Sequence, residues 1–511
     1  RMAIKLALLL VFFAITVAIG LYCRRHATDV NSFVLGGRAV GPWLTAFAYG
    51  TSYFSAVIFV GYAGQFGWKY GVAATWIGLG NAFLGSMLAW IVLGRRTRLM
   101  TQQLKSATMP EFFGRRYGSK ALKLGASAIV FIFLIPYTAS LYNGLSRLFA
   151  MAFNIDYTVC IALMAGLTAV YVVAGGYMAT AINDFVQGIV MIGGIVAVVL
   201  AVLNSNGGLS AAMASLSQVQ DPAVSSAPGA FTSLFGPKPL ELLGVVILTS
   251  LGTWGLPQMV QKFYAIKSEK QIFKGTVIST VFAVVIAGGC YFLGGFGRLY
   301  GDRIDVAASG FDSIIPTMMA NFSPLLIGIV VVLVLSASMS TLSALVLASS
   351  STLTLDFIKG TIVKKMDEKK QVLVMRVLIL VFIAISVVIA IFQYRANVTF
   401  IAQLMGVSWG ALAGAFLAPF LYGLYWKRAN RAGVWASFLF GAGIMILNLL
   451  ARPSFPPLLQ SPINCGAFAM LTGLVIVPVV SLLTKPIERN LIDEAFECYR
   501  GKIDAPVKKA A

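Results

Sequence analysis

Thirteen long apolar segments constrain the fold of this 511-residue chain more than any other feature of its sequence. The hydrocarbon core of a bilayer is about 30 Å thick, so a helix needs about 20 apolar residues to cross it. Most segments are apolar on every face, and none alternates with the period of a strand, which indicates spanning helices and excludes a β-barrel. The segments lie at 3–23, 42–66, 72–94, 121–152, 157–176, 180–203, 240–264, 272–297, 324–355, 371–393, 397–425, 432–451 and 463–484.

The composition agrees with an all-α integral membrane protein. Hydrophobic residues make up 59% of the chain and charged residues 11%, against about 45–50% and about 25% in soluble domains. These values exclude a soluble enzyme, a disordered chain and a nucleic-acid-binding domain. A single histidine, His26, and five cysteines without a CxxC pair leave no material for a haem, a Cys/His metal site or a Ser/His catalytic pair. We therefore expect a protein that is not an enzyme.

Basic residues gather in alternate connections between the segments. The net charge of +21 comes from 39 Lys and Arg against 18 Asp and Glu. Placing the N-terminus outside puts most of these cations in cytoplasmic connections, as the positive-inside rule requires. We predict a multi-pass protein of the cell inner (plasma) membrane with its C-terminus cytoplasmic and no nucleic-acid partner. The connections that would be cytoplasmic are 24–41, 95–120, 177–179, 265–271, 356–370, 426–431 and the tail from 485.

The connections themselves are too short for a further domain. The longest, the extracellular loop 204–239, is rich in Ser, Gly, Ala and Pro, and we expect little fixed structure there beyond a short helix near 208–218. The cytoplasmic tail 485–511 is too short to fold alone. No P-loop pattern occurs in the chain, which argues against ATP-driven transport.

Two segments carry residues that interrupt a spanning helix. Segment 42–66 contains glycines and small hydroxyl residues in its middle, and segment 240–264 contains Pro257 near its middle. Interrupted helices expose backbone groups that bind ions and solutes near the midplane. Because the two segments lie five apart, we predict two inverted five-helix halves, with one helix before and two after them. The corresponding ranges are 1–41, 42–203, 204–239 (the outer loop), 240–426, 427–484 and 485–511.

Polar side chains within the segments are candidates for ion handling. Asp184 lies in the sixth segment, where it either caps the helix at its cytoplasmic end or takes part in ion binding. In the ninth segment Ser336, Ser340, Thr341 and Ser343 place hydroxyls on one face, which serves either helix packing or cation binding. Lys262, near the inner end of the seventh segment, is expected to extend its ammonium to the membrane surface.

Four stretches resemble the sodium:solute symporter family, and most closely its sodium/proline and sodium/pantothenate branch. They are FVLGGRAVGPWLTAF at 33–47, GGYMATAINDFVQG at 175–188, SASMSTLSALVLASSS at 336–351 and GVSWGALAGAFLAPFLYGLYWKRANRAG at 406–433. The resemblance runs over nearly the whole chain. It implies a leucine-transporter-type fold with thirteen transmembrane helices. It also implies import of a small polar solute together with sodium by alternating access.

The resemblance also implies residue roles. A sodium ion would be held by the backbone carbonyls of Thr51, Phe54 and Ala337 and the hydroxyls of Ser340 and Thr341. Some members bind a second sodium, for which Asp184 and Ser343 match here, whereas Ala344 stands where a further hydroxyl is wanted. Tyr53 occupies a position where the proline branch has an aspartate that assists sodium.

Residues at the expected pocket positions indicate the class of solute. Two pocket aromatics of the proline branch correspond here to Thr249 and Thr253, which favours a solute more polar or larger than proline. The candidates are an amino acid such as proline, a small carboxylate such as pantothenate, or a sugar or sialic acid. A passive channel or a transporter-like sensor is the alternative of a different class. Besides solute and membrane lipid, no obligate protein partner is evident. The solute-binding candidates are Ser52, Ser55, Tyr137, Tyr142, Thr249, Thr253, Trp254, Gln258, Gln403 and Trp409.

Overall fold

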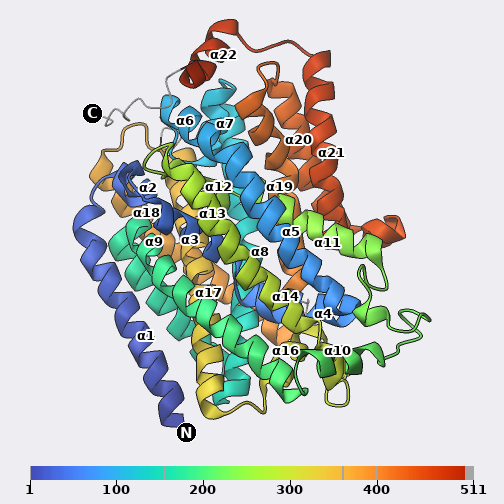
Figure 1. Ribbon diagram of the computed structural model, residues 1–511. Helices are drawn as coiled ribbons and strands as arrows, with labels where there is room; N and C mark the ends of the chain where they lie inside the picture. The colour runs from blue at the N-terminus through green and yellow to red at the C-terminus, as the bar shows by residue number, and fades with distance from the viewer. Residues whose placement is uncertain (1, 155, 360–361, 397–400, 501–511) are drawn as a thin grey trace.

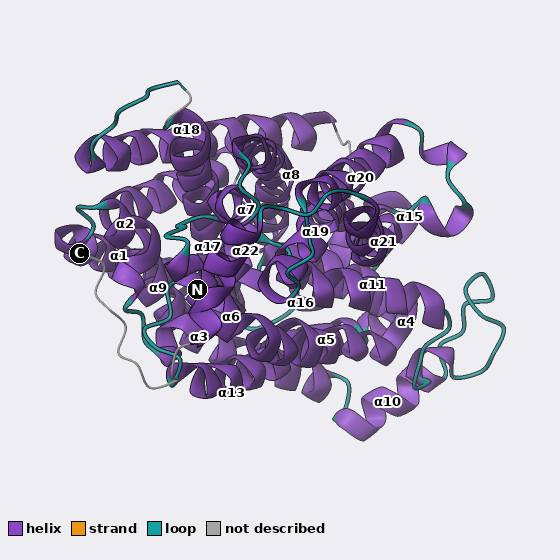
Figure 2. Cartoon of the chain, turned by 90° about the horizontal axis from the view of Figure 1, so that it is seen from above, coloured by secondary structure: helices purple, strands orange, loops and turns teal. Residues whose placement is uncertain are grey.

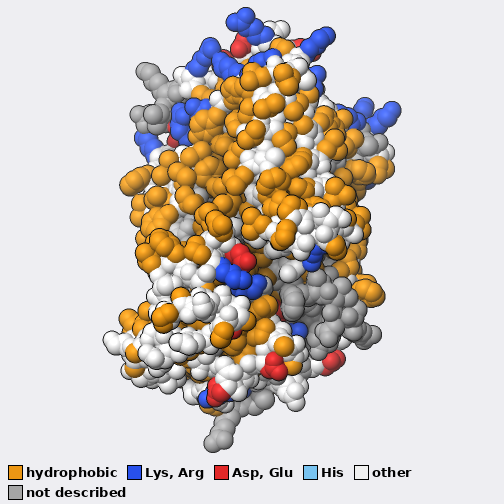
Figure 3. Space-filling model, turned by 90° about the vertical axis from the view of Figure 1, so that its right-hand side faces the viewer, with side chains coloured by type: hydrophobic (Ala, Val, Ile, Leu, Met, Phe, Trp, Pro, Cys, Tyr) orange, Lys and Arg blue, Asp and Glu red, His pale blue; other side chains and the backbone are white. Residues whose placement is uncertain are grey.

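The computed structural model describes residues 2–154, 156–359, 362–396 and 401–500. These residues form helices and connections and no strand, with isolated β-bridges only. A broad band of hydrophobic side chains covers the middle of the surface in Figure 3, and Lys and Arg gather above it. The protein is therefore an all-α, multi-pass membrane protein.

Within the described residues, ten helices are long and apolar enough to cross a membrane, or eleven if one bent pair counts as a span. Two of them, Val57–Gln103 with 47 residues and Ile161–Ser205 with 45, are too long for one crossing and include parts of two predicted segments each. The count of thirteen therefore stays a prediction. The start of the predicted segment 397–425 lies outside the described residues.

The helices follow one another along the chain as labelled in Figure 1. Short π-helical stretches adjoin several of them, for example Val57–Tyr62, which leads directly into α4. The bounds are α1 Met2–Cys23, α2 Val30–Leu35, α3 Pro42–Tyr53, α4 Ala63–Tyr70, α5 Thr75–Ala82, α6 Arg95–Gln103, α7 Met109–Arg116, α8 Lys120–Phe153, α9 Tyr157–Ser205, α10 Leu209–Ser217, α11 Pro239–Leu251, α12 Pro257–Tyr264, α13 Gln271–Ala283, α14 Gly289–Gly294, α15 Val306–Ser309, α16 Ile314–Met319, α17 Pro324–Thr352, α18 Glu368–Ala396, α19 Ile401–Tyr425, α20 Arg431–Leu450, α21 Pro462–Leu483 and α22 Arg489–Phe496.

Both predicted interruptions are confirmed. Helix α3 ends at Tyr53, and Phe54 has an extended backbone with φ −79° and ψ 128°. Between α11 and α12 the chain bends by 40°. Leu256 is extended there because the ring of Pro257 disfavours helical geometry in the residue before it. Each break leaves backbone groups of a helix end without a partner in the helix.

Helix α9 is kinked at Gly176, where φ is 57° and ψ −143°. A Cβ atom at this position would lie 2.6 Å from the carbonyl oxygen of Phe33, so glycine is required for both conformation and space. The kink divides α9 into two stretches, and Asp184 lies in the second.

Helices α17 and α19 form the centre of the bundle. In the view along the long axis, α18 and α8 lie toward one edge and α13 and α5 toward the opposite edge, with α17 and α19 between them (Figure 2). Nearly all side chains of α17 from Val330 onward are buried. The described chain starts with α1 at the lower end in Figure 1, and its last helix, α22, lies at the upper, basic end.

The loop 204–239 has more fixed structure than its composition suggests. The predicted short helix is confirmed as α10, and beyond it Phe231 is 1% exposed. Arg298 donates hydrogen bonds to the Asp221 carboxylate at 2.8 Å and to the Trp68 carbonyl at 2.8 Å. Its guanidinium also lies 4.3 Å from the centroid of the Phe231 ring. These contacts come from residues distant in sequence, so the local composition did not reveal them.

The contact between Arg298 and Asp221 predicts a pH dependence of the loop. The hydrogen bond from Arg298 holds the pKa of Asp221 below its ordinary value. A carboxylate whose pKa is lowered by folding stabilises the folded state above its unfolded pKa, and this contribution is lost as the pH falls through the lowered value. We expect protease cleavage of the loop to increase on acidification below about pH 4. An Asp221→Asn variant should be cleaved faster at neutral pH and lose this acid response; a variant with the wild-type profile would contradict the prediction.

Candidate functional site

The break in α3 presents a row of free carbonyl oxygens to α17. The last carbonyls of any helix lack donors within it, and the carbonyls of Thr51, Ser52 and Phe54 belong to this group. On α17, Ala337, Ser340 and Thr341 share one face because they are three and four residues apart. The helices are packed so that these two sets of oxygens meet, and all the residues are at most 1% exposed.

The hydroxyls of Ser340 and Thr341 lie at the centre of this oxygen cluster. Ser340 Oγ is 3.0 Å from the Thr51 carbonyl oxygen and 2.9 Å from that of Ala337. Thr341 Oγ1 lies within 3.3 Å of four carbonyl oxygens, which belong to Thr51 at 3.2 Å, Ser52 at 3.3 Å, Phe54 at 3.1 Å and Ala337 at 3.1 Å. The structure thus brings together all five predicted sodium ligands and adds the carbonyl of Ser52.

The cluster has more acceptors than donors. Four carbonyl oxygens converge on two hydroxyls, each of which has one proton to donate. Acceptors that outnumber protons in a buried site favour a cation, which interacts with every oxygen at once. Among the described residues no group of three or more His, Cys, Asp or Glu could hold a metal. A site of neutral oxygens suits a hard monovalent cation such as sodium.

Asp184 and Ser343 occupy the region next to this cluster. Asp184 is fully buried, caps no helix, and neither of its carboxylate oxygens has a hydrogen-bond partner in the described structure. Ser343 Oγ donates to the Ser340 carbonyl at 2.9 Å. Asp184 lies one helical turn before Gly188, which packs against Thr51.

Lys262 is buried rather than extended to the membrane surface. Only 3% of the residue is exposed, and its Nζ lies 5.0 Å from the centroid of the Tyr177 ring. The expectation from its position near a helix end was therefore wrong.

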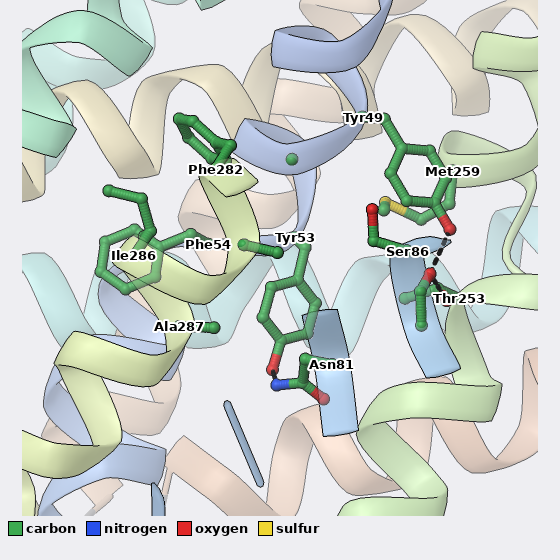
Figure 4. A pocket seen from close by; sticks show the side chains of 13 residues that line it. Tyr49, Tyr53, Phe54, Asn81, Ser86, Thr253, Met259, Phe282, Ile286 and Ala287 are labelled. Atoms are coloured by element: carbon green, nitrogen blue, oxygen red, sulfur yellow. Dashed lines mark hydrogen bonds between the residues drawn. The ribbon is translucent and has the colours of Figure 1, made fainter. Parts of the chain in front are cut away.

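A cavity lies on the other side of the broken segment (Figure 4). Its lining comes from the α3 break, from α5 and the π-helical stretch after it, from the α11–α12 break, and from α13 and its continuation. The lining residues are Tyr49, Gly50, Tyr53, Phe54, Asn81, Gly85, Ser86, Thr253, Met259, Phe282, Ala283, Ile286 and Ala287.

Polar groups in the cavity are connected in a small network. Asn81 donates through its amide to the Tyr53 hydroxyl and accepts from Ser250 Oγ at 3.1 Å. Tyr49 and Thr253 both donate to the Gly85 carbonyl, at 2.7 Å and 3.0 Å. The free space inside is about 20 Å³, roughly the volume that one water occupies. In this conformation the cavity is closed around its own side chains, and a solute requires them to separate.

The predicted solute-binding residues divide into three groups. Thr253 lines the cavity, and Ser52 and Ser55 lie in the break beside it. Next to Tyr53, the Trp409 ring lies 5.7 Å from the Tyr53 ring and 5.9 Å from the Tyr137 ring, measured between centroids. The others lie outside the cavity. Thr249 and Trp254 donate hydrogen bonds to backbone carbonyls, and Gln403 accepts one from Arg452. Gln258 lines a separate small cavity, and the buried hydroxyl of Tyr142 has no partner in the described structure.

Sequence reasoning missed the contribution of the third predicted segment. Asn81 and Ser86 lie within the apolar range 72–94 and reach the cavity. Asn81 is 5% exposed, and a buried amide within a spanning segment is itself a signal of function. Phe282, Ile286 and Ala287 also line the cavity. Their sequence gives no sign of this, because apolar residues in a spanning segment look the same whether they line a cavity or pack against another helix.

Phe54 joins the oxygen cluster to the cavity. Its carbonyl oxygen lies 3.1 Å from Thr341 Oγ1, whereas its side chain lines the cavity (Figure 4). A change in the backbone at this residue therefore alters both sites. This arrangement fits a protein that couples the binding of a cation to that of a solute.

The sequence matches known proteins over most of its length. The model of the family described as "Sodium:solute symporter family" matches residues 33–441. The sodium/proline symporter of Staphylococcus aureus (strain JH9) is 30% identical over 491 residues, 93% of this chain and 92% of that protein. The osmoregulated proline transporter OpuE of Bacillus subtilis (strain 168) is 28% identical over 479 residues, 93% of this chain and 94% of that protein.

A solved structure supports the fold. The structure described as the substrate-bound outward-open state of a Na⁺-coupled sialic acid symporter superposes with a TM-score of 0.74 at 17% identity, covering 95% of this chain and 98% of that one. The resemblance seen in the sequence and the leucine-transporter-type fold are thereby confirmed. The protein is a transporter rather than an enzyme, and sodium is its coupling ion. The chain belongs to the sodium:solute symporter family.

Proposed function

We propose that this protein imports L-proline together with sodium across the cell's plasma membrane by alternating access. Two relatives that align over nine-tenths of the chain are named for proline transport. Thr253 uses its hydroxyl to bond the Gly85 and Ser250 carbonyls, at 3.0 Å each, so it does not call for a solute more polar than proline.

The proposed sodium site consists of the carbonyls of Thr51, Phe54 and Ala337 and the hydroxyls of Ser340 and Thr341. The proposed solute site is the cavity around Tyr53 and Asn81. Alternating access would arise from two inverted halves, 42–203 and 240–426, that move about these sites. The basic end of the molecule would face the cytoplasm and the N-terminus the outside, in accordance with the positive-inside rule. Membrane lipid would surround the apolar band, and no protein partner is required.

Phe54 carries the proposal, because it touches both sites at once. Sodium that binds at its carbonyl fixes the backbone of the break, and this holds the Phe54 side chain in the position that solute binding requires. Solute affinity should therefore be higher with sodium bound, and sodium affinity higher with solute bound, by the same factor.

Equilibrium binding of radiolabelled L-proline to the purified full-length protein tests the proposal. We expect saturable binding in sodium chloride and at least tenfold weaker binding in potassium chloride at the same ionic strength. Unlabelled L-proline should compete, whereas pantothenate, glucose and sialic acid should not. Binding that is equal in both salts would refute sodium coupling, and competition by another solute alone would refute proline as the substrate.

A further inference from the structure

Two ionisable side chains are buried within the spanning helices outside the proposed sodium site. Asp184 on α9 is fully buried and its two carboxylate oxygens have no hydrogen-bond partner in the described structure. Lys262 on α12 is 3% exposed. Both lie within spanning helices, where an uncompensated charge is strongly unfavourable. The proposed sodium site uses neither of them.

Asp184 lies one helical turn from the residue that contacts the proposed sodium site. Gly188 packs against α3 so closely that a Cβ atom there would lie 3.2 Å from Thr51 Cγ2. Asp184 precedes Gly188 by four residues, so both face the same side of α9. The carboxylate is therefore near the site without being one of its ligands.

Tyr177 brings Lys262 to the same face of α9. Tyr177 and Asp184 are seven residues apart, which is two turns, so their side chains lie on one side of the helix. Lys262 Nζ lies 5.0 Å from the Tyr177 ring centroid. Asp184 and Lys262, which are of opposite charge, therefore lie along the same side of α9. In the described structure the carboxylate of Asp184 forms no direct contact with the ammonium.

Lys262 also has room for a small movement. With Tyr177, Gln258, Ala344 and Leu347 it lines a cavity of about 20 Å³ between α9, α12 and α17, enough for one water. The side chain is long and flexible, so its ammonium is able to approach or leave Asp184 without a change of the backbone.

We propose that the Lys262 ammonium is the resident counter-cation of Asp184 and thereby fixes the number of bound sodium ions at one. The inference rests on the sodium site proposed above. That site is made of neutral oxygens, and the Asp184–Lys262 pair is neutral as a whole. The empty transporter therefore has no net charge in this region, and the loaded one carries the single charge of its sodium. Without Lys262, the carboxylate of Asp184 would take a second sodium ion from solution.

Equilibrium binding of radiolabelled sodium to the purified full-length protein tests this, with choline chloride keeping the ionic strength constant. Wild type should bind one sodium ion per chain, and Lys262→Met should bind two. In the double variant Lys262→Met/Asp184→Asn the buried charge is gone, so binding should return to one. Lys274→Met is the matched control: its Nζ lies 5.9 Å from the Trp43 ring centroid, but the residue is exposed. It should bind one.

Two sodium ions on wild type, or one on Lys262→Met, would overturn the inference. If Lys262→Met does not fold, the double variant tests the pairing, because removing both charges should restore folding and the binding of one sodium ion. A double variant that is as unstable as Lys262→Met would contradict the pairing. Failure of the proposed function would look different. If the proposed sodium site is wrong, sodium binding would persist when the hydroxyls of Ser340 and Thr341 are removed from the otherwise wild-type protein. The difference in the number of bound sodium ions between wild type and Lys262→Met would still test the pairing of Lys262 with Asp184.

Discussion

Replacing Ser340 by alanine and Thr341 by valine together should abolish sodium-dependent solute uptake. The valine keeps the shape of threonine, so the loss is confined to two hydroxyls in a site where they face four carbonyl oxygens. A hydrogen-bonding group that interacts with a charge contributes about 1.5–3 kcal/mol. The double substitution should therefore weaken sodium binding by about 10²–10⁴-fold.

The two single variants should rank in a defined order. Thr341 Oγ1 approaches four carbonyls and Ser340 Oγ two, so Thr341→Val should lose more sodium affinity than Ser340→Ala. Sodium titrations of initial uptake rates, at saturating solute, measure both. Ser350→Ala is the matched control, since this buried serine on the same helix bonds carbonyls of its own helix. A control as impaired as the double variant would mean that α17 packing, rather than sodium binding, had been disturbed.

Replacing Asn81 by leucine should raise the KM for L-proline by about 10–100-fold and leave sodium affinity within about twofold of wild type. Leucine has the same branched arrangement of four side-chain heavy atoms as asparagine but offers no hydrogen bonds. The hydroxyls of Tyr53 and Ser250 would lose their partner in the cavity. A buried polar group that loses its partner costs about 1–3 kcal/mol, which sets the size of the effect.

Asn448→Leu separates this effect from a general loss of stability. Asn448 is also fully buried, but its amide bonds the carbonyls of Leu459 and Gln460 at the end of α20. We expect a lower melting temperature for this control with an unchanged KM. If Asn81→Leu changes stability alone, or if it lowers sodium affinity as much as solute affinity, the cavity is not the solute site.

The fold was predictable because lipid leaves few choices. A segment in the bilayer must satisfy its backbone hydrogen bonds internally, so a run of apolar residues identifies a helix directly. The breaks in α3 and before α12 were also visible, since glycines, small hydroxyl residues and Pro257 mark them. The meeting of Thr51 with Ser340 and Thr341 was expected from the family resemblance, because no local pattern specifies which helices are neighbours.

Contacts between distant parts of the chain were not predictable in the same way. Lys262 appeared free to reach the membrane surface, because its contact with Tyr177 comes from another helix. The loop 204–239 appeared loose, because the Arg298 guanidinium that holds it lies about 60 residues further on. The cavity side chains Asn81 and Ser86 were hidden in a segment that reads as ordinary apolar helix.

The most direct test of the account is L-proline uptake into proteoliposomes that contain the purified protein. An inward sodium gradient should drive radiolabelled proline to an internal concentration above the external one, and the double variant at 340 and 341 should show no accumulation. Replacing sodium by potassium on both sides should reduce wild-type uptake to the level of empty liposomes. Accumulation that is equal in sodium and potassium, or equilibration without accumulation under the sodium gradient, would contradict sodium-coupled proline symport.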